Sequence, residues 1–150
     1  MTEITNDREF RAALEGMDAA QQRLAAAAFV NSVLHLCTDA RIARVLEVAG
    51  NPGATDADLA EALKIARATT FDCHTRCGSE GDWLEQAGYF VARAAVAALT
   101  PLGQMPGGVG WQAAMSARMA QTSKSIVTGE NTAGQESDNQ YRLLAGFLNS

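Results

Sequence analysis

The residues whose types and spacing best suit chemistry lie close together in one predicted helix: Cys73, His74 and Cys77. Cys73 and Cys77 are four residues apart, so a helix presents both thiols on one face, one turn from each other. Two thiolates in that arrangement suit zinc, and His74 could be a third ligand after local distortion of the helix. The pattern therefore allows a metal- or thiol-dependent enzyme centred on these three residues.

Core packing is the simpler explanation of the same cysteines. Their spacing differs from the two-residue gap of common zinc knuckles, and only Cys37, with His35 near it, is left to complete a site. Cysteine outside disulfides is among the most buried residue types. The C-terminal end of a helix also disfavours a thiolate, because the helix dipole is negative there. We expect the cysteines to fill the core, with no metal and no other cofactor.

The sequence gives little support for catalysis through a histidine. A Ser–His–Asp or Cys–His arrangement must use His35 or His74, because the chain contains two histidines. His35 lies between Leu34 and Leu36, which predicts a core residue held by one hydrogen bond. No Gly-x-Ser-x-Gly turn of the kind that carries a nucleophilic serine is present. We therefore favour a protein without catalytic activity.

A glycine-rich stretch, residues 103–110, precedes a predicted helix and suggests an anion site. Backbone amides at a helix N-terminus favour anions. However, the stretch lacks the lysine and hydroxyl of a phosphate-binding loop, and no strand is predicted before it. A flexible connector explains the glycines equally well. We predict flexible loops over residues 103–110 and 129–137.

The periodicity of apolar residues predicts an all-α protein in which helices position these groups. Alanine is the commonest residue, at 29 of 150, and apolar residues recur at three- and four-residue steps. The alternating runs typical of strands are lacking. We predict a single helical domain, residues 1–150, built as a bundle of about six helices. They are expected over residues 6–15, 18–37, 39–49, 55–77, 82–99 and 111–128, with a short C-terminal helix over 138–148.

Capping signals support several of these helix starts. Asp18 with Gln21, and Thr55 with Asp58, have the three-residue spacing of a capping box. Asp39 offers a further cap in the middle of an apolar pattern. The chain is expected either to kink there or to begin a new helix.

The helix predicted over residues 82–99 is apolar on nearly every side, so it should lie at the centre of the core. Its alanines would let neighbouring helices approach closely. Arg93 should lie at the rim or be paired. The residues expected to be largely buried are Trp83, Leu84, Ala87, Phe90, Val91, Ala94 and Leu99.

Charge and composition argue against several classes of partner. The formal net charge is −5, and Lys64 and Lys124 are the only lysines, so no basic surface for nucleic acid is expected. No apolar run approaches the ~20 residues of a membrane-spanning helix, so no membrane partner is expected either. An odd number of cysteines, three, does not form a closed disulfide framework, which favours a cytoplasmic protein with reduced thiols.

The C-terminal residues predict a helix that must dock on something. Tyr141, Leu144 and Leu148 form one apolar stripe, and so short a helix is marginal by itself. It could dock on its own bundle, or on a second copy after exchange of the arm. We predict that residues 138–150 contribute to a homodimer interface.

These observations lead to one expected function and one alternative. The chain is expected to be a non-catalytic interaction protein or small-ligand-binding protein that forms a homo-oligomer, because apolar helices supply grooves for partners. The alternative is the metal- or thiol-dependent enzyme centred on Cys73, His74 and Cys77.

Overall fold

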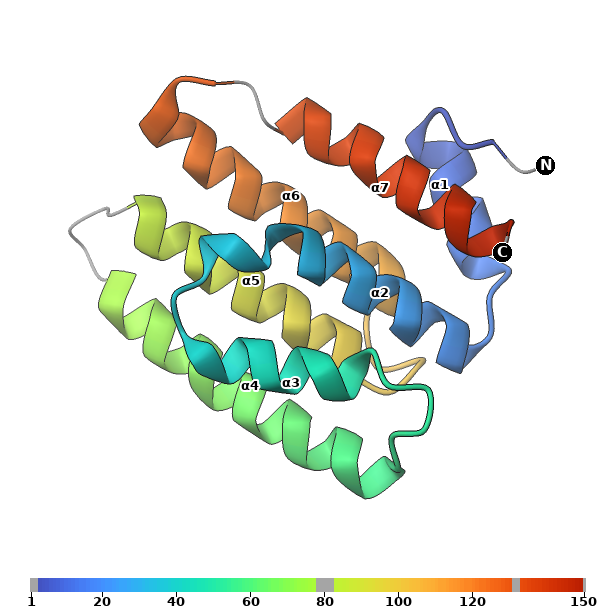
Figure 1. Ribbon diagram of the computed structural model, residues 1–150, viewed down its shortest axis with the longest axis horizontal. Helices are drawn as coiled ribbons and strands as arrows, with labels where there is room; N and C mark the ends of the chain where they lie inside the picture. Colours follow the sequence, from blue (N-terminus) through green and yellow to red (C-terminus); the bar gives the residue numbers. More distant parts are fainter. Residues whose placement is uncertain (1–2, 78–82, 131–132, 150) are drawn as a thin grey trace.

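Helices make up most of the structure, as the sequence predicts (Figure 1). The computed structural model describes residues 3–77, 83–130 and 133–149. In these ranges there are seven α-helices, one short 3-10 helix and no strand, so the predicted all-α bundle is confirmed. None of the helices described is long and apolar enough to cross a membrane. The α-helices are α1 (Asp7–Glu15), α2 (Ala19–Val33), α3 (Ala40–Ala49), α4 (Asp56–Cys77), α5 (Trp83–Leu99), α6 (Val109–Thr128) and α7 (Ala133–Leu148), and the 3-10 helix η1 covers Leu34–Leu36.

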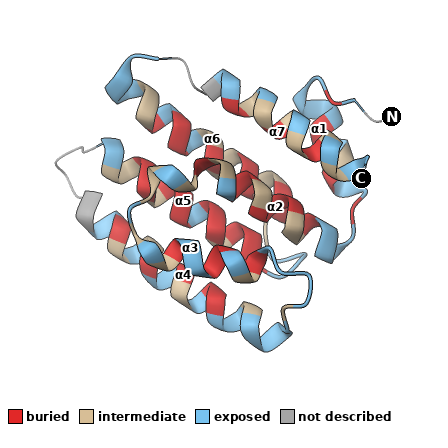
Figure 2. Cartoon of the chain, viewed as in Figure 1, coloured by how far each residue is buried: buried red, intermediate tan, exposed pale blue. Residues whose placement is uncertain are grey.

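The centre of the bundle is α5, which packs against α2, α4 and α6. Most of its residues are buried, as Figure 2 shows. The predicted core residues Ala87, Phe90, Val91, Ala94 and Leu99 are buried, and Arg93 is exposed at the rim as predicted.

The first turn of α5 departs from this prediction. Trp83 is 40% exposed and Leu84 is 53% exposed, so their predicted burial is wrong. These two residues begin the helix at one end of the bundle, where its neighbours α4 and α6 also end (Figure 1). The apolar type of a residue does not show whether it lies in the middle of a packed helix or at its exposed end.

The predicted caps are present at the starts of the helices. The Asp18 carboxylate accepts a hydrogen bond from the backbone N–H of Gln21 at 2.8 Å, and the Gln21 side chain accepts from the backbone N–H of Asp18 at 3.1 Å. Thr55 and Asp58 form the same reciprocal pair before α4, with both distances 3.1 Å. These bonds satisfy backbone donors that have no partner inside the helix.

The helix predicted over residues 18–37 ends early, at Val33. The 3-10 helix η1 follows, and Asp39 then caps α3 by accepting a hydrogen bond from the backbone N–H of Arg41 at 3.0 Å. The chain thus begins a new helix here, which was one of the two expected outcomes.

The last two helices both begin before their predicted starts. Helix α6 begins at Val109, directly after Gly107 and Gly108, whose φ angles of +79° and +97° suit glycine. Helix α7 begins at Ala133, so residues 133–137 are helical and the predicted loop over 129–137 is wrong there. The polar residues that suggested a loop include Glu136, which is buried and hydrogen-bonded between helices.

Helix α7 docks on its own bundle, against α2 and α6. Leu144 is fully buried, and the Tyr141 ring centroid lies 5.5 Å from that of Phe10 in α1. Tyr141 and Leu144 of the predicted apolar stripe are therefore used inside the single chain, whereas Leu148 is 37% exposed. Exchange of the arm between two copies stays a prediction.

A group of buried polar side chains joins α7 to α2 and α6. Glu136 Oε1 accepts a hydrogen bond from Ser32 Oγ at 2.8 Å, and Glu136 Oε2 accepts one from Gln121 Nε2 at 3.5 Å. One turn further on, Gln140 Oε1 accepts from Arg118 Nε at 2.9 Å. Burial raises the pKa of Glu136, against the lowering effect of these hydrogen bonds.

Candidate functional site

The structure gives Cys73 and His74 different surroundings on α4. Cys73 is buried, in agreement with core packing, whereas His74 is exposed and its ring centroid lies 5.3 Å from that of Tyr89. The side chain of Cys77 lies outside the described residues. Among the side chains that are described, no three His, Cys, Asp or Glu residues lie close enough together to hold a metal ion. Metal binding by Cys73, His74 and Cys77 therefore stays a prediction.

The carboxylate next to these residues, Asp72, has a structural partner. The Arg41 guanidinium donates to Asp72 at 2.9 Å and to Asp39 at 2.7 Å, which joins α3 to α4. The two carboxylates raise the pKa of Arg41 above its ordinary value, Asp39 being the larger cause. This charge cluster is satisfied within the chain.

The other histidine also differs from its predicted environment. His35 lies in η1 and is exposed, so its interpretation as a core residue is wrong. The sequence Leu34-His35-Leu36 suggested a continuous apolar helix, but the 3-10 helix changes the direction in which successive side chains point. Cys37, which follows it, is half-buried.

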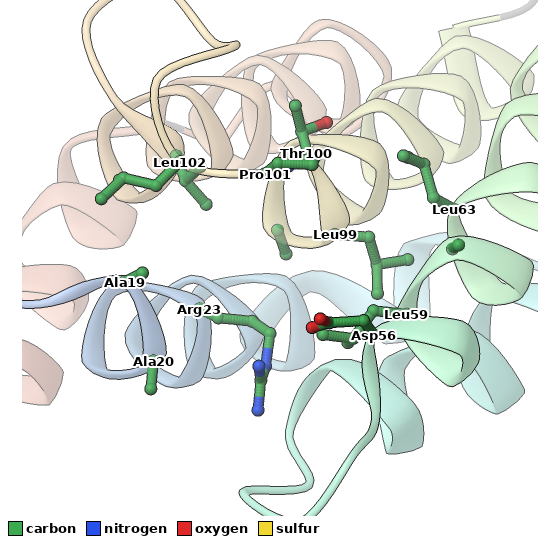
Figure 3. A pocket seen from close by; sticks show the side chains of 13 residues that line it. Ala19, Ala20, Arg23, Asp56, Leu59, Leu63, Leu99, Thr100, Pro101 and Leu102 are labelled. Carbon is green, nitrogen blue, oxygen red and sulfur yellow. The ribbon is translucent and has the colours of Figure 1, made fainter.

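A pocket of about 570 Å³ lies between α2, α4 and the C-terminal end of α5 (Figure 3). We call it the apolar pocket, because most of its lining is hydrocarbon. Its volume lies within the ~300–1,000 Å³ typical of small-molecule sites. The residues that line it are Ala19, Ala20, Arg23, Asp56, Leu59, Ala60, Leu63, Ala98, Leu99, Thr100, Pro101, Leu102 and Val109.

Leucines supply most of the apolar surface of this pocket. Leu63 and Leu99 are buried in the core beneath it, and Leu59 is half-buried. Leu102 follows α5 and Pro101, and it is 49% exposed. Exposed apolar area beside a pocket is removed from water when a ligand binds, which favours binding.

Arg23 of α2 supplies a fixed positive charge on one side of the apolar pocket. Its Nε donates to the carbonyl of Ala49 at 3.0 Å, and its Nη2 donates to the carbonyl of Asn51 at 2.8 Å. Ala49 is the last residue of α3, where the helix dipole is negative, and Asn51 follows the C-cap Gly50. The remaining nitrogen, Nη1, has no hydrogen-bond partner among the described residues.

Asp56 supplies a negative charge to the same pocket. It is exposed in the first turn of α4, and Figure 3 shows it on the same side of the pocket as Arg23, across from Pro101 and Leu102. In the described structure the two side chains form no ion pair with each other. An acceptor and a donor are thus both available to a ligand at this side.

Sequence reasoning did not select the residues of this pocket. Arg23 interrupts an alanine-rich helix, and Leu102 follows a proline in the connector between α5 and α6. In the sequence, each of the two differs in residue type from its neighbours. Their convergence with Asp56 depends on the packing of α2 against the α3–α4 connection, which no local pattern shows.

Comparisons of the chain with protein-family models, with curated proteins and with solved structures give no match.

Proposed function

We propose that the chain is a non-catalytic protein that binds a small, largely apolar molecule in the apolar pocket. The observation that carries this proposal is the pocket itself: about 570 Å³, lined by leucines and alanines, with two polar side chains on one side. Sites of this kind gain affinity from the apolar area buried and orientation from a few polar groups. The apolar faces of the predicted helices favour the same function.

The charges at the pocket favour a neutral polar head on the ligand. A carboxylate would be attracted by Arg23 and repelled by Asp56, and a cation would meet the opposite pair of forces. A hydroxyl or amide group can accept from Arg23 Nη1 and donate to the Asp56 carboxylate. We therefore propose an apolar molecule that ends in such a group.

Fluorescence titration with the neutral probe N-phenyl-1-naphthylamine tests the proposal. Ala60 is exposed on α4 and lines the pocket, so Ala60→Phe would fill it without disturbing the core. The probe should bind the parent protein saturably, and Ala60→Phe should weaken binding tenfold or more.

Ala68→Phe is the matched control, because Ala68 is also exposed on α4 but does not line the pocket. It should leave probe binding unchanged. Equal losses in the two variants, or no saturable binding to the parent, would refute the proposal.

We further propose that the chain forms a homo-oligomer in the cytoplasm. Large apolar side chains, Trp83 and Leu84 of α5 and Ile126 and Val127 of α6, are exposed at the end of the bundle where α5 begins and α6 ends (Figure 1). Exposed apolar surface of this kind supports self-association. Light scattering should give a mass above that of one chain, and Leu84→Lys together with Val127→Lys should reduce it. A monomeric parent would contradict this.

The metal- or thiol-dependent enzyme remains the alternative proposal, and elemental analysis of the purified protein separates it from ligand binding. Stoichiometric zinc in the parent that is lost in the Cys73→Ala, Cys77→Ala double variant would support the enzyme and contradict the non-catalytic function.

A further inference from the structure

A second pocket, between α4, α5 and α6, differs in its chemistry from the apolar pocket. It has a volume of about 240 Å³, and its lining includes Arg67 of α4 and Arg93 of α5. None of the side chains that line it is a carboxylate. We call it the arginine pocket.

Among the described residues, the two arginines keep their polar N–H groups unpaired, although Arg93 also stacks on the rings of Tyr89 and Phe90. In the part of the chain that the structure describes, neither Arg67 nor Arg93 forms an ion pair or a hydrogen bond. Arg41 and Arg118, by contrast, each donate to carboxylates within 3.0 Å. Arg67 and Arg93 thus present two complete guanidinium groups to one hollow.

Neutral donors line the same pocket. The hydroxyls of Tyr89 and Ser116 make no hydrogen bond to any described residue. Gln112 donates one N–H of its amide to the carbonyl of Pro106 at 2.6 Å and keeps the other. The Arg93 guanidinium carbon lies 5.8 Å from the centroid of the Tyr89 ring, so this aromatic face steadies the cation beside the pocket.

We propose that the arginine pocket binds the phosphate group of a small molecule. Two guanidinium groups match the charge of a phosphate dianion, and their planar forks bind phosphate oxygens with two parallel hydrogen bonds each. The hydroxyls and the amide add donors for the same oxygens. The inference does not depend on the apolar pocket or on its ligand.

The charge of its lining distinguishes this pocket from two other hollows of the described structure. The apolar pocket sets Arg23 beside Asp56. The groove between α3 and α4 sets Arg41 and Arg44 beside Asp58 and Glu61. In a chain of net charge −5, a hollow lined by two arginines and no acid concentrates positive potential locally.

Titration followed by two-dimensional NMR at constant ionic strength tests the site. The probes are inorganic phosphate, glycerol 3-phosphate and, as a dianion of different geometry, succinate. The two phosphate probes should give saturable shifts, and Arg67→Gln or Arg93→Gln should weaken their binding tenfold or more. Tighter binding of glycerol 3-phosphate than of inorganic phosphate would assign the site to phosphate esters, and the reverse order would assign it to free phosphate.

The controls distinguish a built site from general attraction to positive charge. Arg142→Gln makes the same change of charge at an exposed position of α7 outside the pocket and should leave binding unchanged. Arg67→Lys keeps the charge but loses the planar fork of the guanidinium group. Its affinity for the phosphate probes should therefore lie between those of the parent and of Arg67→Gln. Because Arg67 and Arg93 are exposed, these variants should keep the parent's melting temperature. Equal weakening by Arg142→Gln, equal binding of succinate, or no saturation would each overturn the proposal.

Discussion

Asp7 and Arg118 form a double hydrogen-bonded ion pair that joins the first turn of α1 to α6. The Arg118 Nη1 and Nη2 atoms lie 3.0 and 2.8 Å from the two carboxylate oxygens of Asp7. The hydroxyl of Tyr141 in α7 donates to the same carboxylate at 2.7 Å. These bonds, the one from Arg118 most of all, hold the pKa of Asp7 below its ordinary value. One carboxylate therefore connects three helices.

Replacing Asp7 by Asn should lower the free energy of unfolding by about 1 kcal/mol at pH 7, a modest value because the carboxylate is half exposed and screened by water. The pKa of Asp7 is lower in the folded state than its ordinary value of 3.8. The carboxylate therefore makes its full contribution to the free energy of unfolding above that value, and the contribution is lost as the pH falls below it. Urea unfolding at pH 7 and pH 3 checks this: the difference between parent and variant should shrink at the lower pH. The exposed Asp138→Asn should change stability by less than about 0.5 kcal/mol at either pH, and an equal effect there would contradict the prediction.

Glu136 shows the opposite behaviour, because burial raises its pKa. Between the unfolded and the folded pKa the native state holds more protons than the unfolded chain, so stability falls as the pH rises through that interval. Glu136→Gln removes this ionisation, and the new amide oxygen can still accept from Ser32. The variant should be more stable than the parent at pH 7, and its advantage should diminish towards pH 4.5.

Thermal melts from pH 4.5 to pH 8 measure that difference. Glu130→Gln, at an exposed position outside the helices, is the control and should follow the parent at every pH. A Glu136→Gln variant that is less stable than the parent throughout would show that the charged carboxylate stabilises the native state through its hydrogen bonds.

Local signals predicted the fold well, and non-local packing explains what they missed. The caps of Asp18 and Thr55 involve residues three positions apart, so the sequence alone contains the whole interaction. The start of α7 could not be seen in this way. Glu136 and Gln140 are polar residues whose partners, Ser32 and Ala114, are 104 and 26 residues away, and the composition alone suggested a loop.

The candidate site was harder to predict than the helices that hold it. The predicted metal site needed His74 to join the face of Cys73 after local distortion, but α4 turns these adjacent residues towards different surroundings. Arg67 and Arg93 lie 26 positions apart on two helices, and each by itself resembles an ordinary surface arginine. Pairing them required knowledge of how α4 packs on α5.

Phe90 and Trp83 should respond differently to truncation, although both are aromatic residues of α5. Phe90 is 9% exposed and belongs to the main core, so Phe90→Ala should cost roughly 3–5 kcal/mol of unfolding free energy. Trp83 is 40% exposed, so truncation removes less buried apolar area and Trp83→Ala should cost clearly less than Phe90→Ala. Urea melts measure both. Equal losses, or a loss below about 1 kcal/mol for Phe90→Ala, would contradict the position of α5 in the bundle.

Gly110 and Gly146 should respond with opposite signs to replacement by alanine. A Cβ atom on Gly110, in the first turn of α6, would lie 2.7 Å from Cδ2 of the buried Leu14 and 3.4 Å from its Cδ1. Overpacking of this kind typically costs 1–3 kcal/mol, and the better helix propensity of alanine offsets about 1 kcal/mol of that. Gly110→Ala should therefore destabilise the protein by about 1–2 kcal/mol. A Cβ on Gly146 in α7 would meet no atom within 4 Å, so Gly146→Ala should stabilise it by up to about 1 kcal/mol.

A double-variant cycle assigns the cost at Gly110 to its contact with Leu14. Leu14→Ala destabilises the protein by itself, because it empties part of the core around Phe10. Removing the leucine also removes the methyl groups that the new Cβ would strike, so Gly110→Ala should cost nothing, or gain slightly, in the Leu14→Ala background. Urea unfolding of the parent, the two single variants and the double variant gives the coupling energy. A cost of Gly110→Ala that persists unchanged without Leu14 would show that α1 and α6 do not pack as closely as this contact requires.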